Sequence, residues 1–159
     1  MQIKFPFDSS KSLIGKASID IEKPVQEVFH YVGERFFDNY PKWAVEVVDF
    51  EPLDGKEVFI GAKAKQIRDD NGVKIESIFQ ITHFEPTSDL TFEGVSAPYR
   101  HTYLFENQQQ LTRLTFSFEL LELEVFMRPF EKLIRCAIED GAESTVENIK
   151  NLVTAQSTG

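Results

Sequence analysis

The pattern of hydrophobic and polar positions predicts a strand near the start of the chain. Ala17, Ile19 and Ile21 alternate with Ser18 and Asp20. A period of two is typical of a strand with one covered face, because successive side chains point to opposite sides of a sheet. We therefore expect a half-buried strand that ends at Ile21.

Two short helices are predicted next. Pro24 suits the first position of a helix, where its missing N–H costs nothing. The apolar residues that follow at helical spacing, and that should form one buried face, are Val25, Val28, Phe29 and Val32. A second helix is expected over Glu34–Tyr40, ended by Pro41. Adjacent helical positions point in different directions, so Phe36 and Phe37 should not both face inward, and one is expected at an exposed rim.

Period-two signals dominate after Trp43, and they are separated by turn signals at residues 54–55, 70–72, 86 and 107–110. In the segment 73–83, the residues expected to point inward are Val73, Ile75, Ser77, Phe79, Ile81 and His83. Two later segments repeat the pattern with Tyr99, His101, Tyr103 and Phe105, and with Leu114, Phe116, Phe118 and Leu120. These segments predict a sheet with one covered face.

A long helix from about Glu124 to Val153 should cover that face. The apolar and small residues at three-and-four spacing are Phe126, Phe130, Ile134, Ala137, Ile138, Gly141, Thr145, Ile149 and Leu152. Pro129 fits only near the start of a helix, so regular helix is expected to begin or kink there. Gly141 costs about 1 kcal/mol relative to alanine, which is explained either by close packing against the sheet or by space for a ligand.

Composition and charge narrow the class of protein. A chain of 159 residues with 42% hydrophobic residues is expected to fold as one globular domain. The net charge of −9 disfavours nucleic acid and anionic membrane surfaces as partners. No segment is long and apolar enough for stable insertion into a membrane. Without a recognisable export signal we expect a cytoplasmic location.

Several kinds of chemistry are not expected. The three histidines, His30, His83 and His101, have no partner at the short spacing of zinc or iron sites, so neither a metal nor another cofactor is predicted. There is no Gly-rich phosphate loop and no Gly-x-Ser-x-Gly elbow. The single cysteine, Cys136, cannot form an internal disulfide and is interpreted as a packing residue.

The order of elements resembles the START-related superfamily, also called SRPBCC. The segments that carry this resemblance are the strand ending at Ile21, KPVQEVFHYV, PKW, ITHFEPTSDLTF, LTRLTFSFEL and the long terminal helix. The chain is similar to the major birch pollen allergen and to the polyketide cyclase and dehydrase family over residues 15–153. Residues 1–14 are then an N-terminal extension, and residues 154–159 a flexible tail.

The resemblance implies an α+β helix-grip fold. A curved antiparallel sheet of about seven strands surrounds the long C-terminal helix, with two short helices after the first strand and an apolar cavity between sheet and helix. It implies binding or transport of a small hydrophobic ligand, such as a lipid, an isoprenoid, an aromatic or a polyketide-like molecule. Two alternatives stay open: a polyketide cyclase or dehydratase, and a protein-interaction module resembling chaperone activators, which leaves room for a protein partner. Fold alone does not choose between them.

The inward-facing pattern also gives a set of candidate site residues. The expected ligand-binding residues are Phe29, Trp43, Ile75, Ser77, Phe79, Ile81, His83, Tyr99, His101, Tyr103, Phe105, Phe116, Phe118, Phe130, Ile134, Ile138 and Gly141. If the protein is an enzyme, the catalytic candidates are His101, Tyr103 and Tyr99, because imidazole and phenol groups orient or protonate a substrate. Each also has a purely structural interpretation as a wall or core residue.

Overall fold

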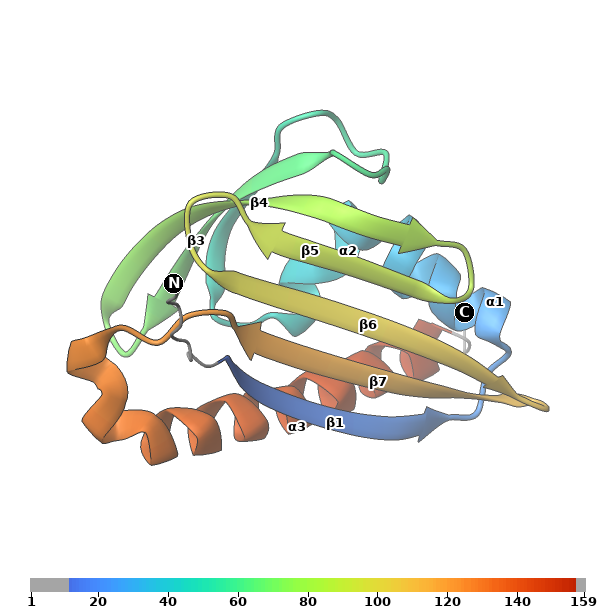
Figure 1. The fold of residues 1–159 in the computed structure, drawn as a ribbon. Helices are drawn as coiled ribbons and strands as arrows, with labels where there is room; N and C mark the ends of the chain where they lie inside the picture. Colours follow the sequence, from blue (N-terminus) through green and yellow to red (C-terminus); the bar gives the residue numbers. More distant parts are fainter. Residues whose placement is uncertain (1–11, 157–159) are drawn as a thin grey trace, which may run out of the picture.

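The computed structural model describes residues 12–156 (Figure 1). In chain order the elements are β1 (Leu13–Ile21), α1 (Val25–Phe29), the π-helical turn η2 (His30–Glu34), α2 (Phe36–Trp43), β2 (Val47–Pro52), β3 (Lys63–Asp70), β4 (Val73–Glu85), β5 (Asp89–Gly94), β6 (Tyr99–Gln108), β7 (Leu111–Leu120), the 3-10 helix η3 (Val125–Phe130) and α3 (Glu131–Gln156). The helix-grip class expected from the sequence is confirmed.

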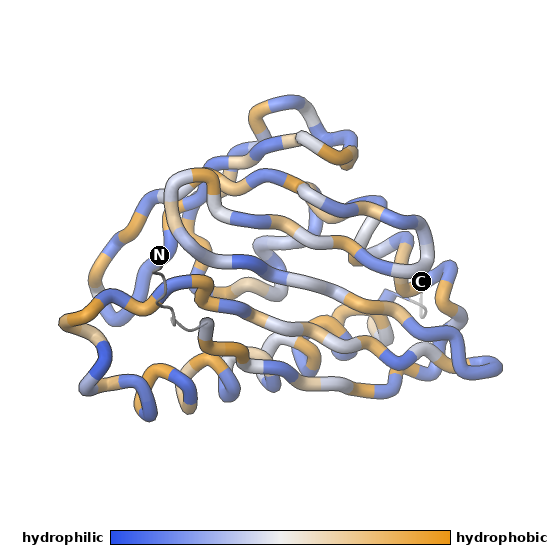
Figure 2. Tube along the Cα trace, viewed as in Figure 1, coloured by the Kyte–Doolittle hydropathy of each residue, from blue (hydrophilic) through white to orange (hydrophobic). Residues whose placement is uncertain are grey.

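The seven strands form one antiparallel sheet in the order β1-β7-β6-β5-β4-β3-β2. Consecutive strands from β2 to β7 are joined as neighbours, and β1 pairs with β7 at the far edge. The turn between β3 and β4 uses Asn71 and Gly72, both at positive φ (54° and 89°), which matches the turn signal in the sequence. The sheet curves around the helices (Figure 1), and hydrophobic positions are interspersed with polar ones along its strands (Figure 2).

The concave face is covered by two helices side by side. α3 lies along β1 and β7, and α2 lies inside the curve toward β2 (Figure 1). Gly15 on β1 permits the close approach of α3, because a Cβ atom there would lie 2.5 Å from the backbone carbonyl of Ile138. Among the described residues, no helix is long and apolar enough to cross a lipid bilayer.

Phe36 and Phe37 are both buried, which corrects the expectation that one lies at an exposed rim. The Phe36 ring packs against Phe79 and Phe92 on the sheet, whereas Phe37 packs against Phe50 of β2. The sheet covers both sides of α2 from which these two rings project, because α2 lies inside the curve of the sheet. The expectation assumed a helix with solvent on one side.

The second helix also continues past Pro41 to Trp43, two residues beyond the expected end. Proline removes the helical hydrogen bond to the carbonyl four residues earlier and its ring crowds that carbonyl, but the residues after it keep their own N–H groups. The backbone N–H of Ala44 bonds the carbonyl of Tyr40 at 3.0 Å and closes the last turn. This extra turn carries the Trp43 side chain into the core.

The C-terminal element is divided into η3 and α3, and the boundary between them follows Pro129, where the sequence predicts an irregularity. The buried residues of α3 are Ala142, Val146, Ile149 and Val153, and none of the residues of η3 is buried. Phe126 and Phe130 are 69% and 53% exposed, in contrast to the expected stripe. The reason is that η3 and the start of α3 extend beyond the edge of the sheet, so no strand lies beneath them (Figure 1).

Candidate functional site

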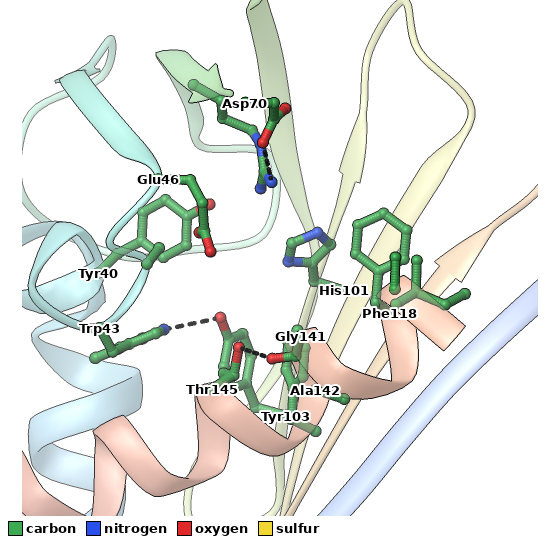
Figure 3. A pocket seen from close by; sticks show the side chains of 15 residues that line it. Tyr40, Trp43, Glu46, Asp70, His101, Tyr103, Phe118, Gly141, Ala142 and Thr145 are labelled. Atoms are coloured by element: carbon green, nitrogen blue, oxygen red, sulfur yellow. Dashed lines mark hydrogen bonds and ion pairs between the residues drawn. The ribbon is translucent and has the colours of Figure 1, made fainter. Parts of the chain in front are cut away.

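A pocket of about 320 Å³ lies between α3 and the concave face of the sheet (Figure 3). The residues that line it come from four parts of the chain. They are Tyr40 and Trp43 in α2 with Ala44 and Glu46 just after it, Arg68 and Asp70 on β3, His101, Tyr103, Phe116 and Phe118 on β6 and β7, and Ala137, Ile138, Gly141, Ala142 and Thr145 on α3. The lining is mainly apolar, and its size is typical of a site for a small organic ligand.

The strand wall follows from the period-two pattern. His101 and Phe118 are paired across β6 and β7, as are Tyr103 and Phe116. Side chains at paired positions of antiparallel strands lie on the same face of the sheet. All four therefore point toward α3, and His101 and Tyr103 are buried.

The helix wall is formed by small side chains. Ala137, Gly141 and Thr145 recur every fourth residue and present little volume to the pocket. A Cβ atom added at Gly141 would meet no atom within 4 Å outside its own helix. The glycine is therefore not required for close packing against the sheet, and its absent side chain leaves space in the pocket.

Trp43 and Tyr103 form the inner end of the pocket. The indole N–H of Trp43 donates to the hydroxyl of Tyr103 at 3.1 Å (Figure 3). On the other side, the amide of Asn148 in α3 donates to the backbone carbonyl of Trp43 at 3.1 Å. These two bonds connect the end of α2 to both the sheet and α3, and so fix the ring of Trp43 in the pocket wall.

Among the described residues, the charged groups of the pocket are one cation and two carboxylates. A guanidinium nitrogen of Arg68 lies 3.3 Å from a carboxylate oxygen of Asp70. Glu46 lines the same pocket and interacts electrostatically with Arg68. These three side chains together give the pocket a formal charge of −1 near neutral pH.

His101 is a titratable group that this environment affects strongly. Burial, assisted by the positive charge of Arg68, lowers the pKa of His101 to about 3. The imidazole is therefore neutral near pH 7, and a neutral imidazole carries one N–H donor and one acceptor nitrogen. Burial raises the pKa of the neighbouring Tyr103 hydroxyl, so this phenol also stays protonated.

Packed aromatic rings fill the concave face between this pocket and α1. Phe79 stacks on Phe92 with ring centroids 4.0 Å apart, and Tyr40 packs against both. At the α1 end, Phe29 packs against Phe105 at 5.0 Å. The pocket therefore occupies the part of the concave face beside residues 137–145 of α3.

A chain of hydrogen bonds runs through the filled region. The Tyr40 hydroxyl donates to the amide oxygen of Gln66 at 2.8 Å, and the Gln66 nitrogen lies 3.5 Å from the hydroxyl of Ser77. Ser77 in turn is 3.1 Å from the hydroxyl of Tyr99. Ser77 and Tyr99 thus pair with each other through their hydroxyl groups. Neither residue lines the pocket, although both were expected to contact a ligand.

The structure thus divides the candidate residues into three groups. Those that line the pocket are Trp43, His101, Tyr103, Phe116, Phe118, Ile138 and Gly141. Those that lie in the core or are partly buried within the sheet are Phe29, Ser77, Phe79, Ile81, Tyr99 and Phe105, and Ile134 is half-buried near the start of α3. Those that are exposed are Ile75, His83 and Phe130. Of the catalytic candidates, His101 and Tyr103 meet in the pocket and Tyr99 does not line it.

His83 points away from the concave face because β4 contains a bulge. The pairing with β5 shifts between Ile81 and His83, so the extra residue reverses which side faces inward. Phe84 takes the inner position and contacts Phe29, with ring centroids 5.5 Å apart. Nε2 of His83 instead lies 2.8 Å from a carboxylate oxygen of Asp89 on the outside.

Ile75 and Phe130 are exposed for a different reason. Ile75 shares the inner side of the sheet with its cross-strand partner Arg68, but it lies near the β3–β4 turn, beyond the part of the sheet that α3 covers (Figure 1). Its side chain is 49% exposed. Phe130 belongs to η3, which also lies beyond the sheet.

Sequence reasoning missed the charged side of the pocket. Glu46, Arg68 and Asp70 line it, yet none was a candidate. The available signal was the alternation of Ala64, Gln66 and Arg68 on one face of β3. This signal is weak because the one apolar member of that face is an alanine, which is depleted in strands and common in helices.

Comparison with known proteins identifies a family that matches most of the chain. A family model described as "Polyketide cyclase / dehydrase and lipid transport" matches residues 14–154. No curated protein sequence matches the chain. Within the described residues, no group of three or more His, Cys, Asp and Glu side chains is placed to hold a metal ion.

Solved structures with the same fold share little sequence with this chain. A protein of Thermus thermophilus has a TM-score of 0.75 at 16% identity and covers 91% of this chain and 99% of its own. The Zhui aromatase/cyclase from Streptomyces sp. R1128 has a TM-score of 0.75 at 8% identity, with coverage of 92% and 96%. A START superfamily protein from Mycobacterium smegmatis has a TM-score of 0.70 at 10% identity, with coverage of 91% and 99%. At these identities the likeness describes the fold alone.

Proposed function

Since the chain belongs to the polyketide cyclase / dehydrase and lipid transport family, we propose that it binds or carries a small hydrophobic ligand in the pocket beside α3. The observation that carries this proposal is the space left by Gly141. A glycine inside a helix costs about 1 kcal/mol relative to alanine, and no packing contact at Gly141 requires it. Space for a ligand would explain why a glycine stands at position 141.

The lining supports an organic ligand with an aromatic or otherwise flat apolar body. Phe116, Phe118, Tyr103 and Trp43 present ring surfaces to the pocket, and aromatic faces stack well on flat apolar groups. A volume of about 320 Å³ is at the lower end of the range for ligand pockets, so the ligand is small. Its identity, the domain limits of 15–153 and a cytoplasmic location stay predictions.

Native mass spectrometry of freshly purified protein tests the proposal. We expect an additional mass of a few hundred daltons, on the order of a small ligand, that is released on denaturation. In Gly141→Phe, whose ring would fill the pocket, this mass should be lost. Asn151→Phe, which places the same ring at an exposed position of α3, should retain it. Equal ligand content in both variants would contradict binding in this pocket.

A second candidate function is a cyclase or dehydratase, favoured by the convergence of His101, Tyr103 and Arg68 on one pocket. Such groups orient carbonyl and hydroxyl oxygens of a substrate. The likeness to an aromatase/cyclase in fold is compatible with this function. Turnover of a poly-β-keto substrate by the purified protein, lost in Gly141→Phe, would favour the enzyme over the carrier.

A further inference from the structure

His101 has an unusual position for a polar side chain. It is 6% exposed and surrounded by the rings of Phe92, Phe118 and Phe116, with ring centroids at 4.4, 4.8 and 5.4 Å. Its Nδ1 atom is buried and has no hydrogen-bond partner within the described residues. Leaving a buried polar group unpaired costs about 1–3 kcal/mol, and a phenylalanine would fit the same apolar surroundings without this cost.

His101 also lines the pocket, where a ligand could provide the missing partner. In Figure 3 its ring stands between Phe118 and the space enclosed by Trp43, Tyr103 and Gly141. The two ring nitrogens are separated by a single carbon, and rotation of the ring by half a turn about the Cβ–Cγ bond exchanges Nδ1 with Cδ2 and Nε2 with Cε1. A half-turn therefore moves Nδ1 to the opposite edge of the ring, from which it can accept a hydrogen bond from a bound molecule.

The charges around the pocket select the kind of ligand. Asp70 and Glu46 outnumber Arg68, the one cation among the described residues that line the pocket, and His101 adds no positive charge because burial keeps its pKa near 3. An anionic ligand would meet a net negative surrounding and would also lose its hydration. A neutral ligand avoids both penalties. A hydroxyl group can donate to one imidazole nitrogen without carrying a charge.

We infer that His101 is the polar anchor of the pocket and accepts a hydrogen bond from the hydroxyl of a neutral, phenol-like aromatic ligand. This inference rests on the proposed binding function and specifies the ligand class for it. Tyr103 is not equivalent, because its hydroxyl already accepts a hydrogen bond from Trp43. Tyr99 is not equivalent either, because its hydroxyl is paired with Ser77.

Three probes with the same two-ring body test the inference: naphthalene, 2-naphthol and 2-naphthoate. Binding is measured by isothermal titration calorimetry near pH 7. We expect 2-naphthol to bind about tenfold more tightly than naphthalene, and 2-naphthoate to bind more weakly than 2-naphthol. In His101→Phe the affinities for 2-naphthol and naphthalene should become equal, while naphthalene binding changes less than about threefold.

Two further variants test whether the preference for 2-naphthol depends specifically on His101. His30→Phe changes an exposed histidine outside the pocket and should keep the preference for 2-naphthol. His101→Leu provides the same comparison if the phenylalanine variant does not fold. The thermal stability of His101→Phe should equal or exceed that of the original protein, because an unpaired buried polar group is removed.

The outcomes distinguish this inference from the proposed function. If naphthalene and 2-naphthol bind equally to the original protein, or if the preference survives in both His101 variants, the anchor role is refuted and the pocket still binds apolar ligands. If 2-naphthoate binds most tightly, the neutral ligand class is refuted. If none of the three probes binds, both proposals are refuted.

Discussion

The side chain of Trp43 donates its indole N–H to the hydroxyl of Tyr103 across 3.1 Å. The two residues are separated by 60 positions in the chain, and the bond joins the end of α2 to β6. Both side chains are buried. Their hydrogen bond is therefore a contact between helix and sheet at the inner end of the pocket, and it fixes the shape of that end.

Removing this hydrogen bond should destabilise the fold. In Tyr103→Phe the indole N–H of Trp43 loses its partner inside the protein, and we expect the free energy of unfolding to fall by about 1–2 kcal/mol. Tyr31→Phe is the matched control, because the buried hydroxyl of Tyr31 has no hydrogen-bond partner within the described residues. Urea denaturation measures both. A control variant destabilised as much as Tyr103→Phe would show that the bond to Trp43 is not the cause.

Two glycines should respond to the same substitution in opposite ways. Gly15→Ala should destabilise the protein by about 1–3 kcal/mol, because its Cβ atom would press against the backbone of Ile138 and displace α3. Gly141→Ala should stabilise it by about 1 kcal/mol, because alanine is the better helix former and the new methyl group enters open space. Thermal unfolding of both variants checks the pair. Destabilisation by Gly141→Ala would mean that the helix wall is packed rather than open.

These two glycines also show how far the sequence predicts the structure. The order of elements, the sheet and the long helix follow from periodicity and turn residues, because those signals act within short segments. A glycine at position 141 signals either close packing or free space, and the sequence leaves both open. The choice depends on the distance between α3 and the strands opposite, which is a property of the whole fold.

The candidate site was predictable only where the alternation is regular. His101, Tyr103 and Phe116 lie on strands without irregularities, and their inward direction follows from period two. The predicted inward direction of His83 was wrong because a single bulge after Ile81 reverses the alternation. No residue type in this segment signals the bulge. Arg68 was missed because a charged residue gives no apolar signal, although its alkyl stem can lie along apolar surface.

The stability of the protein should depend on pH through His101. In the folded protein the pKa of His101 is about 3, whereas an unfolded histidine has a pKa of about 6.5. Between these values the unfolded chain binds more protons, so the free energy of unfolding should decrease as pH falls, by at most about 1.4 kcal/mol per pH unit. Below about pH 6 this part of the slope should be absent in His101→Phe. Parallel slopes for the two proteins would contradict a neutral buried His101.

Trp43 should report occupation of the pocket by an apolar ligand. It is the single tryptophan of the chain and lines the pocket, so all indole emission comes from this site. Anthracene, whose absorption overlaps indole emission, should quench Trp43 fluorescence by energy transfer when it binds. Gly141→Phe should weaken the quenching at equal probe concentration. Unchanged emission in a sample that calorimetry shows to bind anthracene would place the binding site elsewhere.

The distinction between a carrier and an enzyme depends on what His101 and Tyr103 can do with protons. Acid–base catalysis is most efficient when the pKa of the catalytic group lies near the working pH. Burial moves the pKa of His101 down to about 3 and that of Tyr103 upward, so both groups are poorly suited to proton transfer near pH 7 but well suited to hold hydrogen bonds.

We therefore expect His101→Phe to weaken the binding of a hydroxylated ligand by about tenfold. For any substrate that the protein converts, the same change should alter kcat by less than about tenfold, because a group that only holds the ligand does not act in the transition state. Tyr103→Phe should likewise alter kcat by less than about tenfold. Single-turnover kinetics and calorimetry on the same samples separate the two quantities. A loss of kcat of roughly 100-fold or more with affinity preserved would instead identify His101 as an acid–base catalyst, and would favour the cyclase or dehydratase over the carrier.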